Sequence, residues 1–300
     1  MVFLTAAGGC ASSGGGRCSF WIDLYDGEPV PYEDVFDDIQ EARIIYIGET
    51  HTLERHHEMQ ERIVTDLAAK GIPLVLAVEQ MEHNYQEAFD RYAAGDISFD
   101  QLAEDTNWAK RWSNYEQYRG VFEAARRGGA RMVALNARAE TIRKVGKQGL
   151  DGLDEATRAE LPPDIDLDDP MYEQRLKVVM MIHAMVPEER MRKMFEAQVS
   201  RDEVMAHRLA EFMKSDYGKG RTAVVLCGSG HVSHGLGTPA RVRRRMPDAR
   251  DRILILTNSG DLELSPKMRA MMRDITITHE QLRHLDKPYA DYLHARSPKP

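Results

Sequence analysis

Four side chains that could do chemistry each follow a short apolar run of the sequence. They are Glu49, His51, Glu79 and His231. Two imidazoles and a carboxylate with open coordination positions suit Zn, Mn or Fe(II), which prefer nitrogen and oxygen ligands of this kind. A metal of this kind makes water a nucleophile near neutral pH, and a second carboxylate can then act as general base. We therefore expect all four residues in a catalytic site, with His51, Glu79 and His231 as metal ligands.

The apolar runs before these residues have the length and the β-branched composition of buried strands. Such strands are predicted at 43–48, 74–78, 131–135, 222–227 and 252–257. A helical pattern near 53–70 separates the first two, which makes a βαβ unit and therefore a parallel sheet. Ligands of open α/β folds bind beyond the carboxyl ends of the strands. The sequence thus predicts an α/β fold, with a mainly parallel sheet of about five strands flanked by helices.

Three further polar residues are candidates for the same edge. Asn136 follows the third predicted strand, Asp202 lies on a predicted helix, and His56 begins a helix. The segment His-His-Glu that starts at His56 lacks the second His of a His-Glu-x-x-His zinc helix, and we interpret it as a solvated helix start.

The stretch 137–217 contains no convincing strand and reads as a helical subdomain inserted into the sheet. Its helices are predicted at about 171–185 and 188–214. We accordingly divide the chain into a signal remnant and linker (1–20), an α/β core (21–136 and 218–300) and the helical insert (137–217).

Composition excludes several classes of protein. With 300 residues, 42% of them hydrophobic, the chain can bury a sizeable core. A net charge of −8 argues against a nucleic-acid partner, and the arginine-rich run 241–245 is interpreted as a solvated helix face. The glycines after 227 permit close backbone approach, but the Gly-Lys-Ser/Thr ending of a phosphate-binding loop is absent.

The first residues differ from the rest of the chain. Residues 1–9 are apolar and small, Cys10 follows them, and 11–16 form a Ser/Gly linker. This pattern is typical of the end of a bacterial lipoprotein signal, which would place a lipid on Cys10 and tether the domain to a membrane outside the cytoplasm. The alternative is an untargeted N-terminal tail.

Six separated blocks of the sequence resemble the ChaN family of bacterial haem-binding, iron-regulated lipoproteins. The blocks are 47–51 with His56, His57 and Gln60; 78–81; Trp108; 134–136; 197–206; and 228–232. The family is in turn similar to the Tiki, TraB and erythromycin esterase group. The marks of that group are two Gly-x-x-His motifs and an acidic residue, which 48–51, 228–231 and Glu79 match.

The resemblance implies a haem-binding lipoprotein that serves haem and iron acquisition at the cell envelope, anchored on the outer-membrane or periplasmic side. The family binds haem between two subunits through a tyrosine, which implies a haem-linked homodimer, and phenolate is a suitable donor for ferric haem. Tyr172 and Tyr115 are the candidate ligands, although burial in the core explains Tyr115 equally well. His183, Gln198 and Asp202 complete the expected haem-binding set.

The more distant resemblance implies a different activity. In that alternative the strand-end cluster holds a divalent metal and hydrolyses an ester or a peptide, and both functions can belong to one protein.

Overall fold

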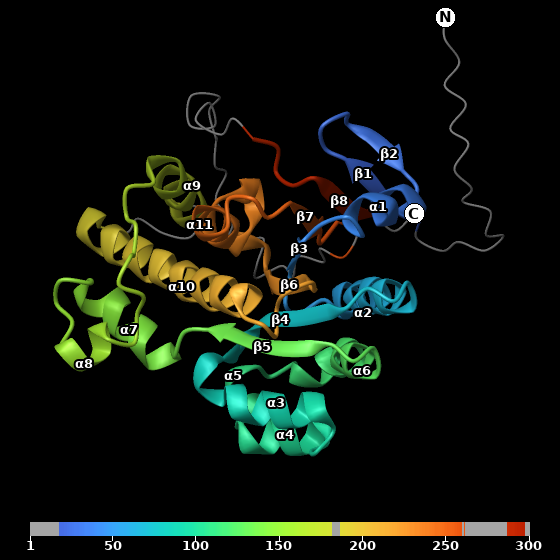
Figure 1. Ribbon diagram of the computed structural model, residues 1–300. Helices are drawn as coiled ribbons and strands as arrows, with labels where there is room; N and C mark the ends of the chain where they lie inside the picture. Colours follow the sequence, from blue (N-terminus) through green and yellow to red (C-terminus); the bar gives the residue numbers. More distant parts are fainter. Residues whose placement is uncertain (1–17, 182–186, 260, 262–286, 298–300) are drawn as a thin grey trace, which may run out of the picture.

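A computed structural model describes residues 18–181, 187–259, 261 and 287–297 (Figure 1). Cys10 and His183 lie outside the described residues. None of the helices in these ranges combines the length and the hydropathy of a membrane span.

The centre of the fold is an eight-stranded sheet in the order β2-β1-β8-β7-β3-β6-β4-β5. The strands are β1 (Ser19–Asp23), β2 (Glu28–Val30), β3 (Ile44–Glu49), β4 (Leu74–Glu82), β5 (Arg131–Asn136), β6 (Thr222–Gly228), β7 (Asp251–Leu256) and β8 (Tyr292–Arg296). From β8 to β5 every neighbouring pair is parallel, and β1 runs antiparallel to both β2 and β8. The α/β class and the mainly parallel sheet are thereby confirmed.

The expected count of about five strands is too low, because three short strands on one side of the sheet were not predicted. β1 and β2 form a hairpin from a segment that contains prolines and acidic residues, and β8 comes from the C-terminal region. These strands are largely exposed or half-buried, so they lack the continuous apolar run that marks a central parallel strand.

Helices cover both faces of the sheet (Figure 1). They are α1 (Tyr32–Ile39), α2 (Glu54–Ala69), α3 (Gln86–Ala94), α4 (Phe99–Asp105), α5 (Trp108–Arg111), α6 (Arg119–Arg127), α7 (Ala139–Gln148), α8 (Glu155–Arg158), α9 (Pro170–Met181), α10 (Glu188–Lys214) and α11 (Gly237–Arg245). Side chains of the central strands alternate between the faces: Ile45 joins the core under α1 to α6, and Tyr46 joins the core under α10 and α11.

Part of the predicted helical insert belongs to the layer that covers the sheet. Met205, Leu209 and Met213 on the C-terminal half of α10 are buried against β3, β4 and β6. Burying each of these side chains stabilises the fold by roughly 1.5–3 kcal/mol. The helix therefore holds its polar residues in a fixed position relative to the strands.

The arginine-rich run at the end of α11 is not a solvated face, so that interpretation was wrong. Arg241 and Arg245 are only 3% and 8% exposed, because Glu203 on α10 lies beneath them. Arg245 Nη1 is 2.7 Å from Glu203 Oε2, and Arg245 Nη2 is 2.7 Å from Asp164 Oδ2. A buried glutamate on α10, distant in the sequence, thus draws Arg241 and Arg245 inward.

Candidate functional site

The parallel register brings the predicted residues to one edge of the sheet. β6 lies between β3 and β4, with Glu49 opposite Gly228 and Val78 opposite Leu226. His51 follows the end of β3 directly, and His231 ends the 3-10 turn Ser229–His231 that follows β6. Glu79 continues β4 toward both of them.

Both histidines turn their Nε2 atoms toward Glu79. His231 Nε2 is 3.4 Å from Glu79 Oε1, and His51 Nε2 is 3.9 Å from Glu79 Oε2. The same Oε2 accepts a hydrogen bond of 2.7 Å from the Gly228 backbone N–H. We call these three side chains, His51, Glu79 and His231, the strand-edge cluster.

Glu49 fixes the orientation of the His51 imidazole. His51 Nδ1 lies 2.7 Å from Glu49 Oε1, which also accepts hydrogen bonds from Gln80 Nε2 and Tyr118 Oη, each at 2.6 Å. Gln60 Nε2 donates to the second oxygen at 2.7 Å, and His57 Nε2 is 3.3 Å from it. Because every side of this carboxylate is occupied, Glu49 fixes the imidazole and leaves no oxygen free to act as a base.

Asp202 on α10 holds His231 in the same way that Glu49 holds His51, through the Nδ1 atom of the ring. His231 Nδ1 lies 2.8 Å from Asp202 Oδ1, which also accepts a hydrogen bond of 2.8 Å from Thr238 Oγ1. Tyr172 Oη donates to Asp202 Oδ2 at 2.6 Å, and the Gln198 amide lies 3.0 Å from His231 Nδ1. A carboxylate on Nδ1 leaves Nε2 directed at the site, as in the second shell of many metal-bound histidines.

These ion pairs control the charges of the cluster. Burial opposes the charge on His231, but Glu79 and Asp202 outweigh it and raise the pKa of His231 to about 10. Burial would likewise raise the pKa of Glu79, yet His231 and His51 lower it to about 2. Burial opposes the charge on His51 too, but the hydrogen bond to Glu49 and the charges of Glu79 and Glu49 together outweigh it and raise the pKa of His51. Without a metal, the cluster therefore pairs a charged His231 with the Glu79 carboxylate.

His51 forms the accessible side of the cluster. Its side chain is 31% exposed, whereas that of His231 is 7% exposed. The Trp112 ring meets His51 edge-on at 4.6 Å, and the Asn114 side chain donates to the His51 carbonyl. A ligand from solvent would therefore reach Glu79 past His51 and Trp112.

No group of three His, Cys, Asp or Glu side chains in the described ranges is already arranged as a metal-ligand set. The expected ligands His51, Glu79 and His231 do meet, but the two imidazoles lie against the carboxylate itself. Two imidazole nitrogens and a carboxylate are donors of the kind that a divalent cation takes, but here each ring approaches a different oxygen of Glu79.

The residues expected to bind haem lie in two places. Tyr172, Gln198 and Asp202 are together beneath His231, where Tyr172 is fully buried and burial, with the charge of Asp202, raises its pKa well above the ordinary value. Tyr172 would have to leave Asp202 to bind a haem iron. Tyr115 is elsewhere, in an aromatic cluster where its ring stacks on Phe99 at 6.2 Å.

Asn136 and His56, the remaining candidates from the sequence, stabilise the backbone at the carboxyl ends of the strands. Asn136 Nδ2 donates to the Glu79 carbonyl at 2.8 Å, which ties β5 to β4. His56 is buried, so its interpretation as a solvated helix start was wrong. His56 Nδ1 accepts from the Thr50 N–H at 3.0 Å, and Nε2 donates to the Thr257 carbonyl at 2.9 Å. This neutral ring fixes the turn between Glu49 and His51.

Sequence reasoning did not assign the residues that surround Glu49. They are His57, Gln60, Gln80 and Tyr118. The spacing of His57 and Gln60 on one face of α2, buried beside the end of β3, is a signal that could have identified two of them.

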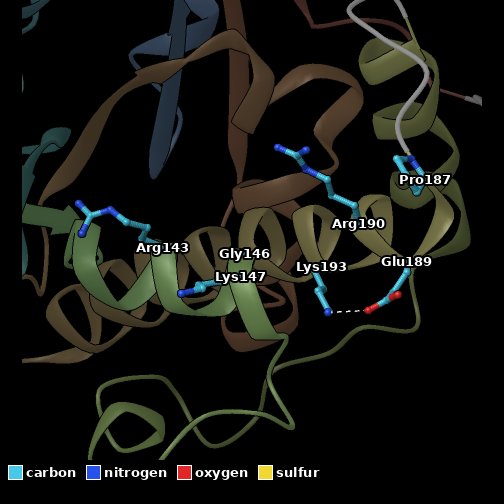
Figure 2. A pocket seen from close by; sticks show the side chains of 7 residues that line it. All are labelled: Arg143, Gly146, Lys147, Pro187, Glu189, Arg190 and Lys193. Atoms are coloured by element: carbon cyan, nitrogen blue, oxygen red, sulfur yellow. Dashed lines mark hydrogen bonds and ion pairs between the residues drawn. The ribbon is translucent and has the colours of Figure 1, made fainter.

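A shallow groove of about 740 Å³ lies between α7 and the start of α10 (Figure 2). It is lined by Arg143, Gly146, Lys147, Pro187, Glu189, Arg190 and Lys193, none of which belongs to the strand-edge cluster. Lys193 Nζ pairs with Glu189 Oε1 at 2.7 Å. The groove is open and basic, and it is separate from the residues predicted to do chemistry.

Comparison with known proteins identifies the family. A family model described as haem-binding uptake, Tiki superfamily, ChaN matches residues 35–242. A solved structure of ChaN of Campylobacter jejuni with cofacial haem is similar over 93% of this chain and 97% of that chain, with 18% identity and a TM-score of 0.68. Erythromycin esterase EreC is more distant, at 11% identity and a TM-score of 0.48 over 93% of this chain and 83% of that one.

One curated protein, from Arabidopsis thaliana, is also similar to this chain. The chloroplastic protein RETICULATA-RELATED 5 of Arabidopsis thaliana is 24% identical over 260 residues, which cover 78% of this chain. The chain spans only 35% of that protein's length. The family match covers more than half of the chain and agrees with the fold, so the protein belongs to the ChaN family of haem-binding uptake proteins in the Tiki superfamily.

Proposed function

We propose that this protein binds haem. The observation that carries the proposal is the family match over residues 35–242, which spans the sheet and the site described above. The solved ChaN of Campylobacter jejuni, which shares this fold, holds haem cofacially. Haem is a large planar dianion, so its site must lie on an accessible surface of the chain and not inside the sheet.

The proposed setting is haem and iron acquisition at the cell envelope. A lipid on Cys10, in the Ala-Gly-Gly-Cys segment of the sequence, would anchor the domain to a membrane. Two cofacial haems would link two copies of the chain, so we also propose a homodimer that depends on haem. Mass spectrometry of the protein from a bacterial membrane fraction tests the anchor, and a Cys10→Ala variant that remains lipidated would contradict it.

A hemin titration of the purified full chain tests haem binding. We expect a saturable shift of the Soret band and, in sedimentation, a conversion of monomer to dimer as hemin is added. A Soret band identical to that of free hemin at every ratio would contradict the proposal. Binding without dimerisation would contradict only the proposed homodimer.

A second candidate function is supported by the geometry of the strand-edge cluster. His51 and His231 each have Nδ1 on a buried carboxylate and Nε2 toward one of the two oxygens of Glu79, an arrangement that brings two nitrogen donors and a carboxylate together. A divalent metal held by His51, Glu79 and His231 would polarise an ester or peptide carbonyl and lower the pKa of water.

This chain's own residues would orient the metal ligands. Glu49 and Asp202 hold the two imidazoles through Nδ1, which leaves Nε2 of each ring directed at the site. His51, as the exposed member, would meet the substrate first.

Elemental analysis tests this candidate independently of haem. The full chain purified in the presence of Zn²⁺ or Mn²⁺ should retain about one metal ion, and the His51→Ala and His231→Ala variants should lose it because two donors do not hold such an ion tightly. His83→Ala serves as the control, since His83 lies outside the cluster. Equal metal content in all four proteins would contradict a metal site at the strand edge.

A further inference from the structure

A small pocket lies between the turn after β4, the loop after α8 and the middle of α10, which packs against β5 (Figure 1). Its volume is about 260 Å³. His83 lines it from the 3-10 turn His83–Tyr85, His207 and Arg208 line it from α10, and residues 159–163 line it from the loop. None of these residues belongs to the strand-edge cluster or to the basic groove of Figure 2. We call this cavity the α10 pocket.

Arg208 brings a positive charge to the pocket without an acidic partner. Its Nε donates to the Ala134 carbonyl at 2.7 Å, and its Nη2 donates to Gln86 Oε1 at 3.2 Å. Both acceptors are neutral, and among the described residues no carboxylate forms an ion pair with this guanidinium. Burial lowers the pKa of Arg208, and the more distant charge of Asp90 offsets this only in part. Because arginine stays protonated in proteins, this half-buried charge favours an anion beside it.

His83 and His207 add two imidazoles whose ring nitrogens make no hydrogen bond in the part of the chain that the structure describes. Both side chains are half-buried, and both line the pocket. Burial, together with the charges of Arg208 and Arg138, lowers the pKa of His83 more than the charge of Glu160 raises it. The His83 ring is therefore neutral at neutral pH and can donate one N–H to a ligand.

The acid in the lining, Glu160, is already engaged by other side chains. Its Oε1 is 2.8 Å from Arg138 Nη1, and its Oε2 accepts a hydrogen bond from the Thr141 hydroxyl. Both oxygens are thus occupied, and Glu160 does not pair with Arg208. The next residues, 161–163, are Leu-Pro-Pro and carry no polar side-chain atom. The pocket therefore combines one unpaired guanidinium with an apolar wall.

We propose that the α10 pocket binds a small organic carboxylate, whose oxygens lie on Arg208 and the two imidazoles and whose apolar part packs against residues 161–163. Arg208 Nη1 makes no hydrogen bond within the described residues, so it is a donor left for the ligand. One guanidinium matches a single negative charge better than the nearly two charges of phosphate. A volume of about 260 Å³ holds a molecule of a few carbon atoms and not haem, so this site is independent of the proposed haem binding.

The test titrates the full chain with butyrate and follows the histidine C–H signals by NMR, which the spectra of His83→Ala and His207→Ala assign. We expect saturable shifts of both signals. The pKa of His83 should rise when butyrate is bound, because a nearby negative charge stabilises the imidazolium. Butyrate should bind more tightly than acetate, by up to about fourfold for each additional buried CH₂ group. Inorganic phosphate should bind more weakly than butyrate.

Two variants locate the binding in the pocket. Arg208→Gln removes the guanidinium and should lower butyrate affinity on the order of 10- to 100-fold. The matched control, Arg143→Gln, removes an exposed cation from the basic groove of Figure 2 and should bind butyrate as wild type does. Because Arg208 also holds the Ala134 carbonyl, the double variant His83→Ala/His207→Ala is measured as well. It leaves that contact intact and should also bind butyrate more weakly.

Several results would overturn the inference. Histidine signals that do not move as butyrate is added would do so, as would wild-type affinity in the double variant. Tighter binding of phosphate than of butyrate would overturn carboxylate as the class of ligand. Equal losses in Arg143→Gln and Arg208→Gln would indicate a general effect of charge and would contradict a site at Arg208. If Arg208→Gln does not fold, the double variant decides the question, and none of these outcomes bears on the hemin titration.

Discussion

His231 and His234 lie in the same loop after β6, yet their surroundings shift their pKa values in opposite directions. Nδ1 of His231 lies 2.8 Å from the Asp202 carboxylate, and Glu79 and Asp202 raise the pKa of His231 to about 10 despite its burial. Nδ1 of His234 lies 3.1 Å from the neutral Lys287 carbonyl, and burial lowers the pKa of His234. Carboxylates beside the buried ring therefore decide whether an imidazole of this loop is a cation or a neutral donor.

The two histidines also differ in access. His231 and Glu79 are almost completely buried, so the strand edge suits a proton or a small cation. His234 is half-buried. The predictions below test whether the strand edge is a rigid, preorganised region.

The largest effect is expected at Glu49. Glu49→Ala leaves the donors of Gln60, Gln80 and Tyr118 buried without an acceptor, so the free energy of unfolding should fall by about 3–5 kcal/mol. Urea denaturation measures it. The control Glu58→Ala removes an exposed carboxylate from α2, the helix that carries Gln60, and should change stability by less than about 0.5 kcal/mol. A loss below about 1 kcal/mol in Glu49→Ala would show that the edge is not preorganised around this carboxylate.

Acid should lower the stability of the same region by protonating His56. Burial lowers the pKa of His56 to about 4 from 6.5, so its neutral form stabilises the fold fully above pH 6.5 and this contribution is lost as the pH falls toward 4. The shift corresponds to about 3 kcal/mol. Unfolding measured between these pH values should show the loss in wild type and a flatter profile in His56→Gln. Parallel profiles for the two proteins would rule out His56 as the titrating group.

Alanine substitutions at two nearby glycines, Gly228 and Gly230, form a matched pair with a smaller expected effect. A Cβ at Gly228 would lie 2.9 Å from His51 Nε2, whereas a Cβ at Gly230 would meet nothing within 4 Å. Gly228→Ala should cost roughly 1–3 kcal/mol and reduce retained metal, because His51 must move. Gly230→Ala should leave both the stability and the metal content near wild type. Equal behaviour of the two variants in unfolding and elemental analysis would contradict the close approach of His51 to β6.

The smallest effect is expected at Trp112. Trp112→Phe keeps an aromatic ring near His51 but loses part of the edge-on contact, so we expect a loss of about 0.5–1.5 kcal/mol in thermal unfolding. Hemin affinity should not change, because Trp112 contacts the strand edge and the proposed haem site is separate from it. A fall in hemin affinity of about 10-fold or more in Trp112→Phe would place the haem beside His51.

Local sequence patterns were sufficient for the centre of the fold and one half of the site. The buried runs of β3, β4 and β6 predicted parallel strands, and a polar residue after each strand must then reach the same edge. The strands β1, β2 and β8 were missed because partly exposed strands lack a continuous apolar run.

The other half of the site depends on contacts between distant segments. The pairing of Asp202 with His231 requires α10 to lie across the sheet, and no spacing in the sequence reports that contact.

Hemin titration of the wild-type chain and of the His51→Ala/His231→Ala double variant, with metal content determined in the same preparations, tests the central claim most directly. We expect both proteins to give the same saturable Soret shift, while only the wild type retains a divalent metal. That result would establish haem binding at a site separate from the strand edge. A wild-type chain that leaves the hemin spectrum unchanged, or a double variant that no longer binds hemin, would contradict the account.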